Sequence, residues 1–99
     1  HSMSNYSSWI VSEAVQRLDR LDASLKWINL WNKQPSDADV RELVDRLLAH
    51  PDIVTDVFLG TNQLTDETGA RLARYVAAST TIEYLSLSHN RIGPATFSA

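Results

Sequence analysis

Cysteine is absent from this 99-residue sequence, so neither disulfides nor thiolate metal ligands are available. Basic residues are also scarce, because 9 Lys and Arg stand against 12 Asp and Glu, and the formal net charge is -3. Nucleic-acid-binding proteins usually carry a basic patch, so we expect no nucleic-acid partner. No apolar run approaches the roughly 20 residues that span a bilayer, and the first residues lack the pattern of a secretory signal. These absences favour a cytoplasmic protein, in a reducing compartment and without contact to membranes.

Motifs for catalysis, cofactors and metals are missing as well. The three His residues form no HxxxH or HExxH spacing, and the sequence has no GxSxG and no Gly-rich phosphate loop. We therefore expect no enzyme activity, no cofactor and no metal site. Because 43% of the residues are hydrophobic, the chain can nevertheless bury a core, and its length fits one small domain.

What the sequence does contain is an internal repeat. Segment 54–64 reads VTDVFLGTNQL, and segment 82–92, which lies 28 positions later, reads IEYLSLSHNRI. Both place apolar residues at the first, fourth, sixth and eleventh positions and Asn at the ninth. A weaker copy, LKWINLWNKQP at 25–35, keeps the first three apolar positions but has Lys33 where the others have Asn. Alternation in these segments predicts strands of one parallel sheet over about residues 25–30, 55–59 and 83–87.

The stretches between these segments carry apolar residues at steps of three and four, which is the period of an amphipathic helix. Ser36 or Asp37 can cap the second helix at its N-terminus, and Thr65 or Asp66 can cap the third. The predicted helices cover about residues 8–21, 37–49 and 66–78. The residues expected to face the core are Val11, Ala14, Val15, Leu18 and Leu21, then Val40, Leu43, Val44, Leu47 and Leu48, then Gly69, Leu72, Ala73 and Val76.

A strand, an Asn-containing turn and a full helix in about 28 residues resemble leucine-rich repeats of the ribonuclease-inhibitor-like subfamily. The segment GTNQLTDETGARLARYVAAS is especially similar to that pattern, and the resemblance covers roughly residues 9–97. It implies an α/β fold that forms a short solenoid, or horseshoe segment. The parallel strands would lie on the concave side and the helices on the convex side, after an N-terminal capping helix. The resemblance also implies that the concave face binds protein.

The repeat boundaries divide the chain into a tail and one domain. His1 and Ser2 are typical of a cloning remnant before Met3, and residues 1–7 are predicted to be this remnant and a polar tail. The domain then covers residues 8–99. Its parts are a capping helix at 8–24, a repeat at 25–53, a second repeat at 54–81 and a partial repeat at 82–99.

The repeat pattern also assigns core and turn positions. Leu59 and Leu87 hold the same position in successive copies, so both are expected to be fully buried. The side chains of Asn62 and Asn90 are expected to hydrogen-bond the backbone of their turns, whereas Lys33 cannot accept a hydrogen bond. The first turn should therefore be built differently from the other two.

Residues between the core positions of each strand point to the opposite face. Two columns of equivalent positions are Trp27, Asp56, Tyr84 and Asn29, Phe58, Ser86. Exposed aromatic clusters usually mark an interface. The candidate partner-binding residues are Trp27, Asn29, Trp31, Asp56, Phe58, Tyr84, Ser86 and His89. In the alternative interpretation, one or two of these aromatics fold over the open edges of a short solenoid, and Trp9 is expected to cover the core face of the first helix.

These features predict a protein-binding module that is monomeric on its own and recognises another protein through its concave strands. Ribonuclease-inhibitor-like repeats occur in enzyme inhibitors, innate immune receptors, actin regulators and bacterial effectors, so the expected action is to block the active site of a partner enzyme. The alternatives are an adaptor or scaffold, or a fragment of a larger leucine-rich-repeat receptor or effector. For a secreted bacterial effector, the place of action is the host cytosol.

Overall fold

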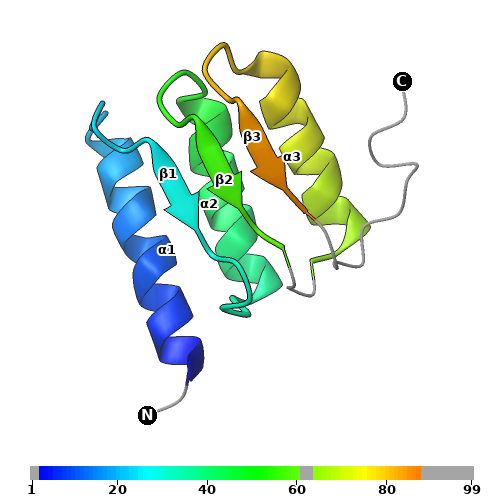
Figure 1. Cartoon of the computed structure of the whole chain (residues 1–99). Helices are drawn as coiled ribbons and strands as arrows, with labels where there is room; N and C mark the ends of the chain where they lie inside the picture. Colours follow the sequence, from blue (N-terminus) through cyan, green and yellow to red (C-terminus); the bar gives the residue numbers. More distant parts are fainter. Residues whose placement is uncertain (1–2, 61–63, 88–99) are drawn as a thin grey trace.

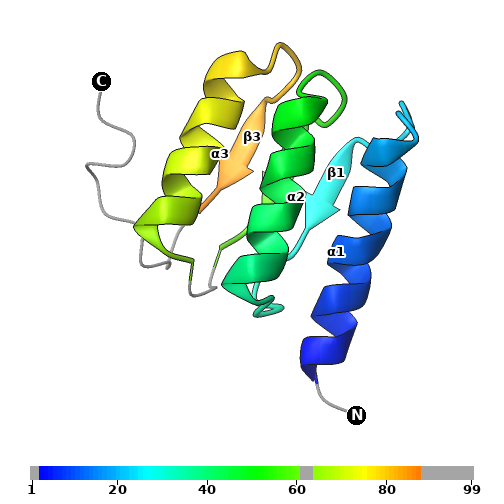
Figure 2. The ribbon, with the colours of Figure 1, turned by 180° about the vertical axis from the view of Figure 1, so that it is seen from behind.

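The computed structural model describes residues 3–60 and 64–87, with residues 3–7 described by their backbone alone. Within these ranges, three helices alternate with three strands along the chain. The helices are α1 (Met3–Asp19), α2 (Asp37–Ala49) and α3 (Asp66–Ala78), and the strands are β1 (Trp27–Asn29), β2 (Asp56–Phe58) and β3 (Tyr84–Ser86). The strands form one parallel sheet in the order β1-β2-β3, and these helices all lie on the same face of it (Figures 1 and 2). The predicted α/β class is confirmed, while the sheet is not curled and does not by itself show a solenoid.

The bounds of α2 and α3 agree with the predicted ranges to the residue, because local signals mark the ends of these helices. Ser36 has an extended backbone, and its hydroxyl oxygen accepts a hydrogen bond from the Asp39 backbone N–H at 3.1 Å, as an N-cap residue does. Thr65 takes the same position before α3, but its hydroxyl donates to the Asp37 carboxylate instead of capping the helix.

Helix α1 begins at Met3, so the prediction of a polar tail is wrong for residues 3–7. Adding residues to an existing helix costs little, and Ser and Asn have only moderately unfavourable helix propensities. The helix ends in a Schellman motif, in which the Asp22 N–H donates to the Arg17 carbonyl and Leu21 adopts a φ of 56°. This left-handed residue leaves the helical face, and Leu21 is 60% exposed rather than buried as predicted.

The strands are three residues long, which is shorter than predicted, but their register confirms the predicted columns. Val57 in the middle of the sheet lies opposite Ile28 on one side and opposite Leu85 on the other. Pairing continues past the end of β1, because the Leu30 N–H donates to the Phe58 carbonyl at 2.8 Å. Each row across the sheet therefore consists of residues from equivalent repeat positions.

The core lies between the sheet and the helices. Its buried residues include Val11, Ala14, Val15, Leu18, Leu25, Ile28, Leu30, Val40, Leu43, Val44, Leu47, Val54, Val57, Leu59, Leu64 and Leu72. Leu59 is 0% exposed as predicted, whereas Leu87 is only partly buried, so the prediction for Leu87 is wrong. Val76 was also expected in the core but is 39% exposed, and its neighbour Tyr75 is buried instead. Both corrections have one cause, since β3 and α3 are the last described elements of their layers and each is covered on one side only.

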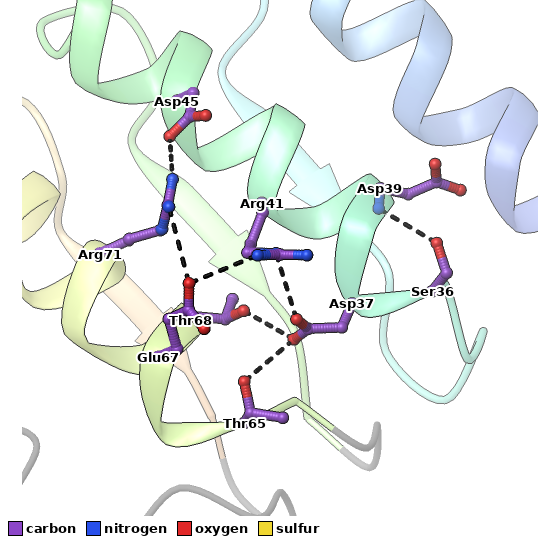
Figure 3. Close-up of polar contacts among 9 residues, drawn as sticks. All are labelled: Ser36, Asp37, Asp39, Arg41, Asp45, Thr65, Glu67, Thr68 and Arg71. Carbon is purple, nitrogen blue, oxygen red and sulfur yellow. Dashed lines mark hydrogen bonds and ion pairs between the residues drawn. The ribbon is translucent and has the colours of Figure 1, made fainter.

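Polar contacts on the helix layer join α2 to α3 (Figure 3). The Asp37 carboxylate, at the start of α2, accepts from the Thr68 hydroxyl at 2.6 Å and from the Thr65 hydroxyl at 3.3 Å. Farther along the helices, the Arg71 guanidinium donates to Asp45 at 2.7 Å. Thr68 is fully buried, whereas the ion pair is partly exposed, so we expect the Thr68 hydrogen bond to contribute more to stability.

Replacing Thr68 by valine keeps the shape of the buried side chain but removes its hydrogen bond to Asp37. We expect the free energy of unfolding to fall by about 1–3 kcal/mol, because a hydrogen bond to a charged acceptor is lost in the interior. Thr65→Val is the matched control, since it removes a longer contact to the same carboxylate at an exposed position, and we expect a loss below about 0.5 kcal/mol. Urea denaturation followed by circular dichroism measures both variants, and equal losses would contradict the role assigned to Thr68.

Tyr75 is fully buried, and its hydroxyl has no hydrogen-bond partner among the described residues. Burial raises the pKa of Tyr75, and the neighbouring Ser79 side chain opposes this rise only in part. The Ser79 hydroxyl oxygen already accepts hydrogen bonds from the backbone N–H groups of Thr81 and Ile82. The unpaired Tyr75 hydroxyl therefore lowers the stability of the fold.

Tyr75→Phe should accordingly raise the free energy of unfolding by about 1 kcal/mol, because it removes an unpaired buried group and keeps the ring. Tyr84→Phe is the control, since Tyr84 is 51% exposed and its hydroxyl can bond water. Its expected effect on stability is within about 0.5 kcal/mol. A drop in the melting temperature of the Tyr75→Phe variant would show that the buried hydroxyl does have a partner.

Candidate functional site

The sheet face that carries none of the described helices, called the open face below, presents six side chains in two rows (Figure 1). The first row is Trp27, Asp56 and Tyr84, and the second row is Asn29, Phe58 and Ser86. Ile28 and Val57, which lie between the rows, point to the helices and are buried. This alternation follows from the two-residue period of a strand, and it confirms the predicted columns.

Forked backbone hydrogen bonds at the start of the strands fix the first row. The Lys26 carbonyl accepts from the Thr55 N–H at 2.8 Å and from the Asp56 N–H at 3.1 Å. One repeat later, the Thr55 carbonyl accepts from the Glu83 N–H at 2.7 Å and from the Tyr84 N–H at 3.1 Å. Because the same fork occurs twice, the side chains of the first row stand at the same level on adjacent strands.

Three of the four aromatic candidates are exposed: Trp27 is 68% exposed, Trp31 54% and Tyr84 51%. Phe58 was expected to be exposed as well but is half-buried. Its ring packs against Tyr84, with ring centroids 5.3 Å apart and 44° between the ring planes. Tilted ring pairs at such distances stabilise one another by about 0.5–1.5 kcal/mol. Phe58 therefore supports the position of Tyr84 as well as forming part of the surface.

Asn29 and Trp31 are linked by a local turn that follows β1. The side-chain carbonyl of Asn29 accepts from the Trp31 backbone N–H at 3.1 Å, which is an Asx turn. Asn32 and Gln34 come next, both with a φ of 54°, and between them the Lys33 N–H donates to the Leu30 carbonyl at 3.2 Å. The Asn29 side chain thus helps to shape the turn, and its amide nitrogen remains as the donor that it offers to a partner.

Asp56 supplies the negative charge of the two rows. Its side chain is partly buried, and its Oδ1 atom accepts from the Thr55 hydroxyl at 2.6 Å. No ion pair reaches Asp56 from any residue within the described ranges. The first row is therefore a carboxylate flanked by two exposed aromatic rings.

The remaining candidates contribute less. Ser86, at the end of the second row, is half-buried. His89 lies outside the described residues. Asn62 and Asn90 lie outside them too, and the prediction that they hydrogen-bond the backbone of their turns remains a prediction.

Two exposed apolar features were missed by sequence reasoning. Trp9, expected to cover the core face of α1, is instead 62% exposed, so that prediction is wrong. At the β3 edge of the sheet there is a cavity of about 450 Å³, lined by Val76, Ile82, Glu83, Tyr84, Leu85 and Leu87. This end cavity adjoins the open face through Tyr84. A signal for it was available, because Val76 belongs to the last complete helix of the repeat pattern and no further helix follows to cover it.

The chemistry of the open face is that of contact rather than of ionisation. The described residues contain no group of three side chains that could hold a metal, and none of the described helices is long and apolar enough to cross a membrane. The carboxylates with shifted pKa values lie in loops. Hydrogen bonds from Ser24 and Arg17 lower the pKa of Asp22, and the Thr80 backbone N–H and hydroxyl lower the pKa of Asp52. Their stabilising effect is complete above the ordinary Asp pKa of 3.8 and is lost at more acidic pH.

Comparison of the chain with protein-family models, with curated proteins and with solved structures found no match. The arrangement of the open face is therefore the observation from which a function is proposed.

Proposed function

We propose that this protein is a protein-binding module whose partner lies across the open face. The observation that carries the proposal is the pair of exposed rings, Trp27 and Tyr84, held at one level by the sheet, with Phe58 in the adjacent row. Aromatic side chains bury a large area on few rotatable bonds, so they lose little conformational entropy when a partner binds. They are also the residues that most often dominate binding energy at protein interfaces.

The spacing of the rings fits a segment of a protein partner. Adjacent strands lie about 4.8 Å apart, so Trp27 on β1 and Tyr84 on β3 stand about 10 Å apart across the sheet. One extended segment or loop of a partner fills such a gap. In this arrangement Trp27 and Tyr84 contact its sides, and Asp56 and Phe58 contact it from below.

We also propose that the chain is a short leucine-rich-repeat segment of the ribonuclease-inhibitor-like kind, with the open face as its concave side. The support is the return of strand and helix at intervals of 28 or 29 residues, together with the parallel register of all three described strands. In this proposal the protein acts in the cytoplasm, or in the host cytosol if it is a secreted bacterial effector, and it acts by binding rather than by catalysis.

The proposed action is occupancy: the module covers the active site of a partner enzyme and inhibits or regulates it. The second candidate is an adaptor or scaffold, or a fragment of a larger leucine-rich-repeat receptor or effector. A specific observation favours this second candidate, because the end cavity beside Val76 and Leu85 is an apolar surface that a further structural element would cover. A purely inhibitory module needs the open face alone.

The test begins with capture of the partner on immobilised protein, in three parallel forms: wild type, Trp27→Ala and Trp9→Ala. Both tryptophans are well exposed, at 68% and 62%, but only Trp27 lies on the open face. We expect mass spectrometry to find a protein that wild type and Trp9→Ala retain and Trp27→Ala loses. Equal capture by all three forms would contradict the proposal.

A second measurement separates the two candidate actions. If the captured partner is an enzyme, the wild-type protein is titrated into its activity assay. Loss of activity at a one-to-one ratio supports inhibition by occupancy. Full activity in the saturated complex supports the adaptor instead.

A further inference from the structure

The Asp56 carboxylate lacks the counter-charge that comparable carboxylates of this protein have. The side chains of Asp22 and Asp37 are 27% and 29% exposed, and each forms an ion pair with an arginine of the same chain. Asp56 is likewise partly buried, yet no cationic side chain within the described residues pairs with it. A partly desolvated carboxylate without a cation is a favourable position for a cation from outside.

The chain's own nearby cation is used elsewhere. Lys26 directly precedes β1, the strand next to Asp56, but its ammonium donates to the Ile53 carbonyl at 3.2 Å. The Thr55 hydroxyl takes one carboxylate oxygen of Asp56, Oδ1, at 2.6 Å. The second oxygen, Oδ2, accepts no hydrogen bond from any described residue, so the carboxylate can still receive donors.

The two neighbours of Asp56 in the first row are suited to a flat cation. Trp27 and Tyr84 lie directly opposite Asp56 on the two adjacent strands, and both rings are more than half exposed. Aromatic faces attract cations, and they attract an arginine guanidinium in particular because it stacks on them through its plane. The guanidinium also presents paired N–H donors whose spacing matches a carboxylate, which the single ammonium of lysine does not.

We propose that Asp56 receives an arginine side chain of the partner protein, with the guanidinium held between the rings of Trp27 and Tyr84. The inference rests on the proposed function and adds the chemistry of the partner, which must present an exposed arginine on the segment that crosses the sheet. The net charge of -3 supports it, because attraction between a negative module and a positive segment speeds their encounter.

The first experiment needs no identified partner. The probe is Nα-acetyl-arginine amide, titrated into the isotope-labelled full chain while the Trp27 indole N–H and the Asp56 and Phe58 backbone amides are followed by NMR. We expect saturable shifts at these three signals and none at the Trp9 indole. Nα-acetyl-citrulline amide, which has nearly the same shape without the charge, should give no saturable shift.

Two variants test the carboxylate. Asp56→Asn keeps an acceptor oxygen for the Thr55 hydroxyl and removes the charge, so the fold should persist, which its melting curve verifies. We expect its affinity for the arginine probe to fall by about tenfold or more. Glu42→Gln is the matched control, because Glu42 is an exposed residue on α2 and its substitution changes the net charge equally. An equal loss in both variants would overturn the inference, as would equally strong binding of Nα-acetyl-lysine amide.

The captured partner then separates this inference from the proposed function. Weakening by both Trp27→Ala and Asp56→Asn, with a smaller salt dependence for Asp56→Asn, supports both. Weakening by Trp27→Ala alone overturns the arginine site and leaves the open face as the binding surface. Binding that neither variant changes overturns both.

Discussion

Replacing Leu59 by alanine is expected to lower the free energy of unfolding by about 2–5 kcal/mol, the usual cost of a large-to-small change in a core. Leu59 is 0% exposed, and it follows β2, the central strand, where both neighbouring strands are present. The substitution therefore leaves a cavity that the surrounding residues cannot easily close. Because small domains are stable by only about 5–15 kcal/mol, this single change can remove much of the stability. Urea denaturation at several temperatures measures the loss.

Leu87→Ala is the matched control for this prediction. Leu87 holds the same repeat position 28 residues later but is only partly buried, so its truncation exposes less new apolar surface. We expect a loss of about 1–2 kcal/mol, clearly smaller than that of Leu59→Ala. Equal losses at the two positions, or an unchanged melting temperature for Leu59→Ala, would show that the packing assigned to the two strands is wrong.

Truncation of Trp27 is expected to have the largest effect on partner binding. Truncating a central aromatic anchor often costs about 2 kcal/mol or more, which corresponds to about thirtyfold in affinity. Trp27→Ala should therefore raise the dissociation constant about thirtyfold, measured by calorimetry with the partner that the capture experiment identifies. Phe58→Ala should weaken binding as well, in part because Tyr84 loses the ring that it packs against.

The controls for this prediction lie on the helix layer. Trp9→Ala removes an equally large exposed ring from α1, and we expect binding within about twofold of wild type. Arg41→Ala and Arg71→Ala should also bind nearly normally, although each breaks ion pairs between α2 and α3 and can change stability slightly. If Trp27→Ala and Phe58→Ala bind like wild type while the Arg variants lose binding, the open-face model is wrong. The exposed aromatics are then better explained as covers for the ends of a short solenoid.

Much of the candidate site could be predicted because it depends on periodicity. A shift of 29 residues relates Trp27 to Asp56, and a shift of 28 relates Asp56 to Tyr84, and the sheet pairs these same residues. The alternation of side chains along each strand then decides which residues lie opposite the helices. Similarly, Ser36 marked the start of α2 through a cap that involves residues only three positions away.

The errors all concern surfaces whose burial depends on a neighbour. Val76 and Leu87 occupy core positions of the repeat, but they lie on the side of the last described elements that nothing described covers. Leu21 departed from the helical face because a left-handed residue ended α1 one turn early. Phe58 was expected to project freely and instead packs on Tyr84, a residue 26 positions away.

The sequence alone determined the order of the elements, the parallel rows and the residue types on each face, because periodicity and caps act over a few neighbouring residues and the repeat carries them along the chain. Only the tertiary structure decided how deeply each position is buried, that the Phe58 ring supports Tyr84, and that Asp56 stays without a counter-ion while Lys26 bonds to Ile53. The physical reason is that burial and charge pairing depend on which groups from distant parts of the chain come within contact distance. A pattern along the chain names the face of a side chain, but the atoms that cover the side chain come from other elements.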